Sequence, residues 1–436
     1  MSELKQNEDH DEMVSLPKVL LINVQSLSLE NATGHTLRNL FESWPNDMLM
    51  QICLDINVNN RRKEHIKTIN IELTWIPFEK AFRKIYKIFT GNEQSQIQVK
   101  TGINAAIRDV SISGKLHDAI RGLLDISPVF LPSDVLSKII SFNPDVVYTM
   151  GASIRALRLS NKLAERFKIP ISLHLMDNWP ETKYTSSILL KPIRRLMFHE
   201  LNKLHSRSGA GIAISPKMAE YYEKRQGVKY YNAMNCVDYI SQKLFRNEDG
   251  CVRFLYAGGL HLNRWKSLAV VAGCLAEMRN EGHSAELVVH IPDVDKHNFG
   301  ELLIKHGVII KPFVPANEIE KLLAGADVLL LLESFDRNVI QFTLYSMSTK
   351  VPEYMSAGRP ILSYAPKMLA SSEYIIKTQS GIVVETENEL KQAIKTVIMD
   401  KAERIKMAKN GVETAKKYHT KKMVAETMIK VLTTKK

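Results

Sequence analysis

The sequence has few cysteines and no long apolar run. Its four cysteines, at positions 53, 236, 251 and 274, form no Cys-x-x-Cys pair and show no histidine spacing of the zinc type. We therefore expect no disulfide framework and no structural zinc, and reduced thiols in a cytoplasmic protein fit best. The longest apolar runs, such as 328–332, are much shorter than a membrane span. These absences predict a soluble or peripheral protein.

The start of the chain also lacks a targeting signal. Residues 1–16 are polar and acid-rich, without the basic start and apolar run of a signal peptide, and we expect a flexible tail there. The chain as a whole is 45% hydrophobic and only 24% charged, which excludes disorder. Lys plus Arg number 59 against 47 Asp plus Glu, a net charge of +12 that favours an anionic partner. No stacking motif or known nucleic-acid-binding domain is present, so we expect no nucleic acid partner.

Short apolar runs alternate with longer amphipathic segments along the chain. The first series of expected strands lies at 19–24, 48–54, 145–149, 171–176 and 211–215. The second series lies at 252–257, 286–291, 308–310, 327–332, 360–364 and 381–385. Near-continuous Val, Ile, Leu and Met in such runs is typical of buried parallel strands. Helix patterns lie between them, most clearly at 192–205, so the fold class is α/β with two doubly wound, Rossmann-like sheets.

The polar stretch 239–250 separates the two series of strands. We predict an N-terminal Rossmann-like domain over 17–238, a linker over 239–250 and a C-terminal Rossmann-like domain over 251–416. A last segment, 417–436, holds a helix pattern with no strand after it. Ligands in such folds bind at domain interfaces and at the carboxyl ends of strands.

A glycine pair follows the expected strand that ends at Ala257. Gly258 and Gly259 begin a turn that leads through Arg264 and Lys266 into a helix. Glycines let the backbone approach an anion, the helix N-terminus offers unpaired N–H groups, and the two cations add charge. The segment predicts a pyrophosphate site, and the alternative is a tight turn with a solvated basic rim.

A second motif lies at the start of a short expected helix. Lys350 and Glu353 flank Pro352 in its first turn, and Gly358 suits its end. A carboxylate in this place can accept both hydroxyls of a ribose while the lysine meets a phosphate. The alternative is an acidic residue that only complements the helix dipole.

Asp177 follows the expected strand 171–176 in the first half of the chain. It emerges at the carboxyl end of that strand, where a side chain faces the cleft. Such a carboxylate can orient or deprotonate an acceptor hydroxyl. The alternative is an Asx turn that leads into Trp179 and Pro180.

These motifs, in this order, resemble the GT-B glycosyltransferases, in particular the retaining, nucleotide-sugar-dependent family-4 group. The resemblance covers most of the chain and rests on the Gly34 loop, 144–147, 177–179, 214–218, 235–238 and the segments of Arg264 and Glu353. It implies two facing domains, the first binding the acceptor and the second the nucleoside diphosphate sugar, with 417–436 crossing back to the first. It also implies a glycan or polyprenyl-linked acceptor, as in surface polysaccharide biosynthesis.

The resemblance also implies roles for single residues. Arg264 and Lys266 would hold the donor diphosphate and Glu353 the ribose. The loop with Gly34 would approach the donor phosphates across the cleft, and Gly259 and Lys350 belong to the same donor site. The implied reaction is front-face attack without a covalent nucleophile.

The chain departs from the family eight positions before Glu353. The family has an acidic residue there, but this chain has Tyr345, which carries no charge at neutral pH. We expect Asp336, with Glu333 as the alternative, to take over the contact to the donor sugar. The missing acid also leaves open a non-catalytic nucleotide-sugar binding protein, and the same fold serves nucleotide-sugar epimerases.

Two further patterns concern metal binding and contact with a membrane. Asp293 and Asp295 spell Asp-x-Asp, which holds a metal in the other large glycosyltransferase fold; we interpret them here as a solvated loop. No metal or other cofactor is expected, because Arg264 and Lys266 already supply positive charge. The pattern of 75–90 predicts a basic aromatic helix that contacts an anionic membrane, and the alternative is a helix packed on its own domain.

Overall fold

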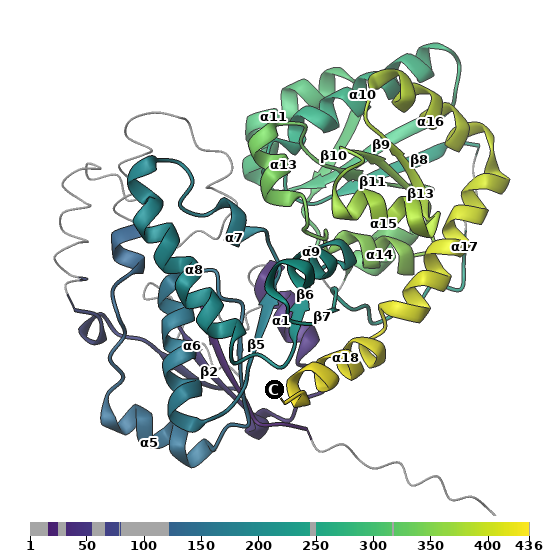
Figure 1. The fold of residues 1–436 in the computed structure, drawn as a ribbon. Helices are drawn as coiled ribbons and strands as arrows, with labels where there is room; N and C mark the ends of the chain where they lie inside the picture. Colours follow the sequence, from purple (N-terminus) through teal and green to yellow (C-terminus); the bar gives the residue numbers. More distant parts are fainter. Residues whose placement is uncertain are drawn as a thin grey trace, which may run out of the picture.

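The computed structural model describes residues 16–24, 32–54, 66–77, 79, 122–244, 250–315 and 318–435. These residues form two parallel sheets, each flanked by helices (Figure 1). The two predicted Rossmann-like sheets are confirmed. Most of the segment predicted as a membrane-binding helix, 75–90, lies outside the described residues.

The first sheet has seven strands in the order β3-β2-β1-β4-β5-β6-β7. Their bounds are β1 Val19–Asn23, β2 Leu49–Cys53, β3 Lys67–Asn70, β4 Val146–Thr149, β5 Ile171–Leu175, β6 Gly211–Ala213 and β7 Tyr230–Asn232. Five of these strands were predicted. The two edge strands, β3 and β7, were not, because they are short and polar rather than continuous apolar runs.

The second sheet has six parallel strands in the order β10-β9-β8-β11-β12-β13. They are β8 Val252–Ala257, β9 Ala285–Ile291, β10 Val308–Pro312, β11 Val328–Leu332, β12 Ile361–Tyr364 and β13 Gly381–Val384. All six were predicted to within two residues at each end. Strands β8 and β11 are buried almost throughout, which explains their continuous apolar sequence.

Helices connect the strands in both domains. In the first domain they are α1 Ala32–Leu40, α5 Ser133–Phe142, α6 Ile154–Phe167, α7 Trp179–Thr182, α8 Lys191–His205 and α9 Pro216–Gln226, with short 3₁₀ turns η1 Asn46–Met48, η2 Leu73–Trp75 and η3 Ile188–Leu190. In the second they are α10 Arg264–Asn280, α11 Asp293–Lys305, α12 Ile319–Ala324, α13 Arg337–Thr343, α14 Lys350–Ser356, α15 Ala370–Thr378, α16 Glu387–Met399 and α17 Lys401–Tyr418. Side-chain caps fix several starts: Ser153 accepts from the backbone of α6 and Ser215 from that of α9.

The last helix, α18 (Lys421–Thr433), returns to the first domain (Figure 1). Helix α17 packs on α14 of the second domain, and α18 then contacts α1, β4 and β7. Val424 and Met428 of α18 are buried in one cluster with Val19 and Leu37. The predicted crossing of the C-terminal helix is confirmed, while the boundaries at 238 and 251 stay predictions.

Among the described residues, no helix combines the length and the apolar character that a membrane crossing would need. That part of the chain also contains no group of three or more His, Cys, Asp and Glu side chains able to hold a metal ion.

Candidate active site

A pocket of about 280 Å³ lies between the two domains. The first domain contributes Thr36, Met176, Asp177 and Ile214. The second contributes Gly259, His261, Leu262, Arg264, Glu333, Phe342, Thr343, Ser346, Met347, Ser348, Thr349, Lys350 and Ser371. Several of these residues follow the carboxyl ends of β5, β8 and β11, the place where doubly wound sheets bind ligands.

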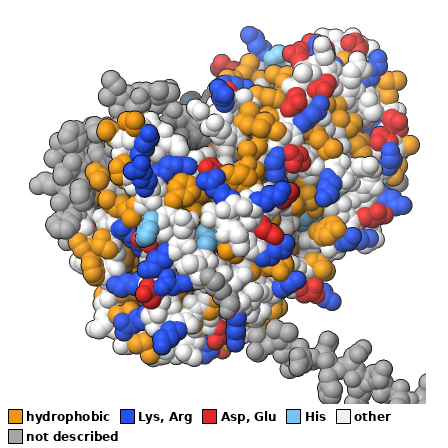
Figure 2. All heavy atoms as spheres, viewed as in Figure 1, with side chains coloured by type: hydrophobic (Ala, Val, Ile, Leu, Met, Phe, Trp, Pro, Cys, Tyr) orange, Lys and Arg blue, Asp and Glu red, His pale blue; other side chains and the backbone are white. Residues whose placement is uncertain are grey.

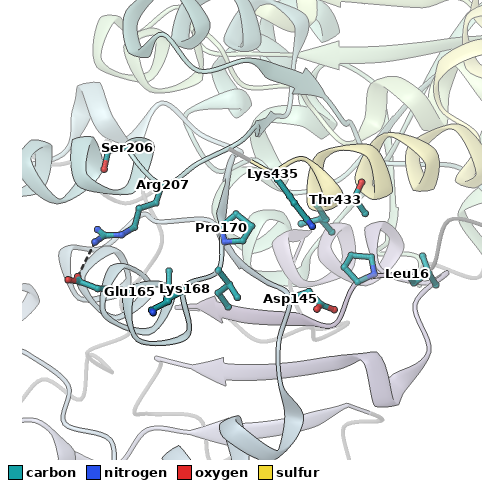
Figure 3. A pocket seen from close by; sticks show the side chains of 13 residues that line it. Leu16, Asp145, Glu165, Lys168, Pro170, Ser206, Arg207, Thr433 and Lys435 are labelled. Atoms are coloured by element: carbon teal, nitrogen blue, oxygen red, sulfur yellow. Dashed lines mark ion pairs between the residues drawn. The ribbon is translucent and has the colours of Figure 1, made fainter.

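A larger cavity, of about 860 Å³, lies at the opposite edge of the first sheet. Its lining includes Pro17, Asp145 and Pro170, each just before a strand, and Lys435 near the chain end (Figure 3). Glu165 and Arg207 in its wall form an ion pair at 3.1 Å. None of the residues predicted for the site lines this cavity, so the smaller interdomain pocket is the candidate active site.

The turn after β8 brings a lysine against the backbone. Gly258 has a φ of +139°, and a Cβ on it would lie 2.5 Å from Nζ of Lys350. Only glycine combines this conformation with that approach. The Lys350 ammonium also lies 4.2 Å from the ring centroid of Tyr256, whose hydroxyl donates to the Gly259 carbonyl at 2.8 Å. Strand, turn and lysine are therefore fixed together.

Arg264 makes a bidentate ion pair with Glu333. Nε donates to Oε2 at 3.1 Å and Nη2 to Oε1 at 3.0 Å, and the two side chains are 14% and 5% exposed. Nη1 of Arg264 lies 3.1 Å from Nε2 of His261. Burial, then Arg264, lowers the pKa of His261 to about 4, so its neutral ring accepts this hydrogen bond. Arg264 thus has a fixed orientation at the pocket wall.

Lys266 and Asp336 lie outside the lining of the pocket. They pair with each other at 3.1 Å, and their side chains are 52% and 40% exposed. Asn263 also donates to Asp336, and both Leu262 and Asn263 have a φ of +59°. Of the two acids considered for the sugar contact, Glu333 lines the pocket and Asp336 does not, so the geometry favours Glu333.

Lys350 and Glu353 follow each other within one turn of α14. Burial, with Arg264 next in effect, lowers the pKa of Lys350 to about 7, and burial raises the pKa of Glu353 to about 7. In the part of the chain that the structure describes, no carboxylate lies within ion-pair distance of Lys350. Lys350 lines the pocket, whereas Glu353 is not among its lining residues. The ribose contact of Glu353 stays a prediction.

Asp177 of the first domain lines the same pocket as these residues of the second domain. It follows β5 and lines the pocket beside Ser346. Burial raises the pKa of Asp177 to about 6, and a hydrogen bond from Ser346 partly offsets that rise. A carboxylate with a pKa near neutrality suits a general base. Gly34 lies in the first half of α1 rather than in a loop, and of this helix Thr36 reaches the pocket.

Tyr345, at the position of the missing acid, points to the first domain. Its ring stacks on that of Tyr221 in α9, with centroids 4.5 Å apart and an angle of 23°. Ser215 donates to its carbonyl at 2.6 Å. Tyr345 therefore holds the two domains together instead of lining the pocket.

The solvated-loop interpretation of Asp293 and Asp295 is wrong. Both lie in the first turn of α11, after Pro292. Asp293 is exposed, but Oδ2 of Asp295 accepts from the backbone N–H of Leu260 at 2.8 Å, next to the glycine turn. A proline followed by acidic residues is a signature of a helix start, and it offered the signal for this helix.

The comparisons with known proteins agree with this geometry. Residues 274–430 match a family model described as glycosyl transferase-like. The matched segment runs from the second half of α10 to most of α18. No curated protein matches its sequence. The fold is similar to that of HepE from Anabaena in complex with UDP, at 13% identity and a TM-score of 0.61, covering 95% of this chain and 99% of HepE.

Two other solved structures share the fold. Sucrose-phosphate synthase from Thermosynechococcus elongatus is 13% identical with a TM-score of 0.58, covering 95% of this chain and 97% of that one. The α,α-trehalose 6-phosphate synthase from Burkholderia multivorans is 10% identical with a TM-score of 0.60, covering 96% and 98%. The predicted GT-B fold and glycosyltransferase class are confirmed at the level of fold and domain family.

Proposed function

We propose that the protein transfers a sugar from a nucleoside diphosphate sugar to a hydroxyl of a glycan or polyprenyl-linked acceptor, with retention of configuration. The observation that carries this proposal is one pocket in which Arg264 and Lys350 of the second domain lie opposite Asp177 of the first. HepE, with the same fold, has been solved with UDP and with UDP-glucose. This transfer would take place in the cytoplasm, as a step in the assembly of surface polysaccharide.

The residues of the pocket have complementary roles in this reaction. Lys350, without an ion-pair partner in the described part of the chain, neutralises the charge that grows on the departing diphosphate. Arg264 adds a second cation whose orientation Glu333 fixes. Asp177 accepts a hydrogen bond from the acceptor hydroxyl and orients it for attack on the same face of the sugar that the diphosphate leaves. These charges need no metal, and we propose a metal-independent transfer.

Donor binding tests the first half of this proposal. Calorimetry with UDP-glucose and other nucleoside diphosphate sugars should detect binding, and Lys350→Met should weaken it by roughly tenfold or more, because a charge-assisted contact to phosphate is lost. Lys395→Met, an exposed lysine on α16, is the matched control and should bind as the parent does. Equal affinities of the parent and Lys350→Met would show that Lys350 does not contact the donor.

Transfer tests the second half. Asp177→Asn should slow release of the nucleoside diphosphate in the presence of candidate acceptors and leave donor affinity unchanged. Activity should persist in EDTA. Donor binding without any acceptor-dependent release would instead identify a nucleotide-sugar binding protein, the alternative that the tyrosine at position 345 keeps open.

A further inference from the structure

One tip of the first domain exposes two adjacent aliphatic side chains. Ile188 and Leu189 of η3 are 71% and 78% exposed, while Leu190 is buried. No other large apolar side chain among the described residues is as exposed. Contact of these side chains with water is unfavourable, and a localised apolar feature on a surface marks an interaction site.

Cations lie next to this tip. Lys191 and Arg195, one turn apart at the start of α8, are exposed, and neither forms an ion pair within the described residues. The acid of the preceding helix α7, Glu181, is already engaged by Arg194 at 3.4 Å and by Arg225 at 3.3 Å. Blue and orange spheres accordingly lie side by side over α8 in Figure 2. The tip therefore combines exposed aliphatic carbon with uncompensated positive charge.

We propose that η3 and the first turn of α8, residues 188–195, dock the protein on an anionic lipid bilayer. Ile188 and Leu189 enter the boundary between headgroups and acyl chains, and Lys191 and Arg195 contact lipid phosphates. A soluble polyanion would also suit the two cations, but it offers nothing to the two aliphatic side chains. The combination of both features favours a bilayer.

The position of the tip links it to the candidate active site. Asp177 lies between β5 and α7, and η3 is the next element before α8. A bilayer at this tip lies on the side of the first domain that carries Asp177, where a lipid-linked acceptor would enter. This link rests on the proposed function, whereas bilayer binding itself does not.

Co-sedimentation with vesicles tests the docking surface on the full chain. Vesicles of phosphatidylcholine alone are compared with vesicles that also contain phosphatidylglycerol. The parent should bind the anionic vesicles, and binding should weaken with salt, because screening shortens the reach of exposed charges to about 8 Å at physiological ionic strength. Ile188→Glu with Leu189→Glu, and separately Lys191→Glu with Arg195→Glu, should each lower the partition by roughly tenfold or more.

A matched control separates this surface from net charge. Lys395→Glu with Met399→Glu changes an exposed lysine and an apolar side chain that is 66% exposed on α16 of the second domain, and it should bind as the parent does. Thermal unfolding confirms that all variants fold. A parent that stays in solution overturns the proposal. So does binding that survives the aliphatic change but not the charge reversal, which would indicate a soluble polyanion. Vesicle binding by a protein that binds no nucleotide sugar would refute the proposed function and leave the docking surface intact.

Discussion

Asp295 fixes the glycine turn after β8, which we propose to bind the donor, with a hydrogen bond from the backbone N–H of Leu260. Asp295→Ala should therefore weaken donor binding and lower the stability by about 1–3 kcal/mol, because the buried N–H of Leu260 loses its acceptor. Asp293→Ala is the matched control: it lies in the same helix turn, is exposed, and loses only a contribution of about 0.3–1 kcal/mol to the helix dipole. Calorimetry and thermal unfolding measure both effects. Indistinguishable variants would show that the hydrogen bond has no role.

Lys350, which we propose to contact the donor diphosphate, should make donor affinity dependent on pH. Its pKa is lowered to about 7 by burial and by Arg264, and Glu333 and Glu353 act in the opposite direction. A bound diphosphate favours the protonated lysine, so the affinity for UDP-glucose should be constant below about pH 7 and fall above it, by up to about tenfold per pH unit. UDP-glucose is the right probe because its diphosphate does not titrate in this range. Lys350→Arg keeps its charge, so its affinity should not change with pH in this range. A parent whose affinity is the same at pH 6 and pH 9, or rises with pH, would contradict this mechanism.

At the scale of elements, the sequence predicts buried strands best. Strands β8 and β11 of the second sheet are nearly continuous apolar runs because they are buried almost throughout, and both were located from that feature. Edge strands β3 and β7 lack this feature, because they are short and only partly buried. The start of α11 was not predicted, because acidic residues after a proline are compatible with a solvated loop as well as with a helix start.

Helix α18 shows how one element ties the chain end to the first domain. Met428 is fully buried against the first sheet, while Met423 on the same helix is 38% exposed. Met428→Ala should destabilise the first domain by about 2–5 kcal/mol through the cavity it leaves, and Met423→Ala should cost much less. Chemical unfolding of the two variants measures the difference. Equal losses of stability in the two variants would show that the packing of Met428 does not stabilise α18 on the first domain.

At the scale of the molecule, three buried histidines make stability depend on pH. Tyr148 contacts His174, Tyr230 contacts His205 and Tyr374 contacts His419, at 2.6, 2.7 and 2.9 Å. Burial lowers the pKa values of these histidines to about 3, 4 and 4 respectively.

The sign of this effect follows from proton binding. Between pH 4 and the usual histidine pKa of about 6.5, the unfolded chain binds protons that the folded protein excludes. The contribution of these three histidines to stability should therefore be full above about pH 6.5 and fall below it, by up to about 1.4 kcal/mol per pH unit for each ring, partly offset by the raised pKa values of Asp177 and Glu353. Thermal unfolding at pH 7 and pH 5 measures the loss, and His419→Gln should reduce the slope. A melting temperature that rises on acidification would contradict the assignment.

The candidate site depends on contacts that sequence order does not reveal. Arg264 and Lys350 were expected at the donor site because each follows a recognisable turn or helix start. Glu333 was ranked second, because only the fold brings the end of β11 against the start of α10. The role of Tyr345 depends on α9 of the other domain, which no local pattern indicates.

Tyr345 lies at a contact between the domains, and this decides what its replacement should do. Two hydrogen bonds also cross this interface: Asn178 donates to the carbonyl of Gln341 at 3.0 Å, and Ser215 donates to the carbonyl of Tyr345. The stack of Tyr345 on Tyr221 is therefore one of several contacts between the domains. Tyr345→Phe keeps the stack and should keep activity. Tyr345→Glu restores the acid of the family pattern, but its carboxylate would face Tyr221 rather than the pocket. We therefore expect no gain in turnover and a loss of about 0.5–1.5 kcal/mol of stability, the usual value of an aromatic pair. Nucleoside diphosphate release and thermal unfolding of both variants measure these effects, and a higher turnover of Tyr345→Glu would show that the side chain at this position reaches the donor sugar after all.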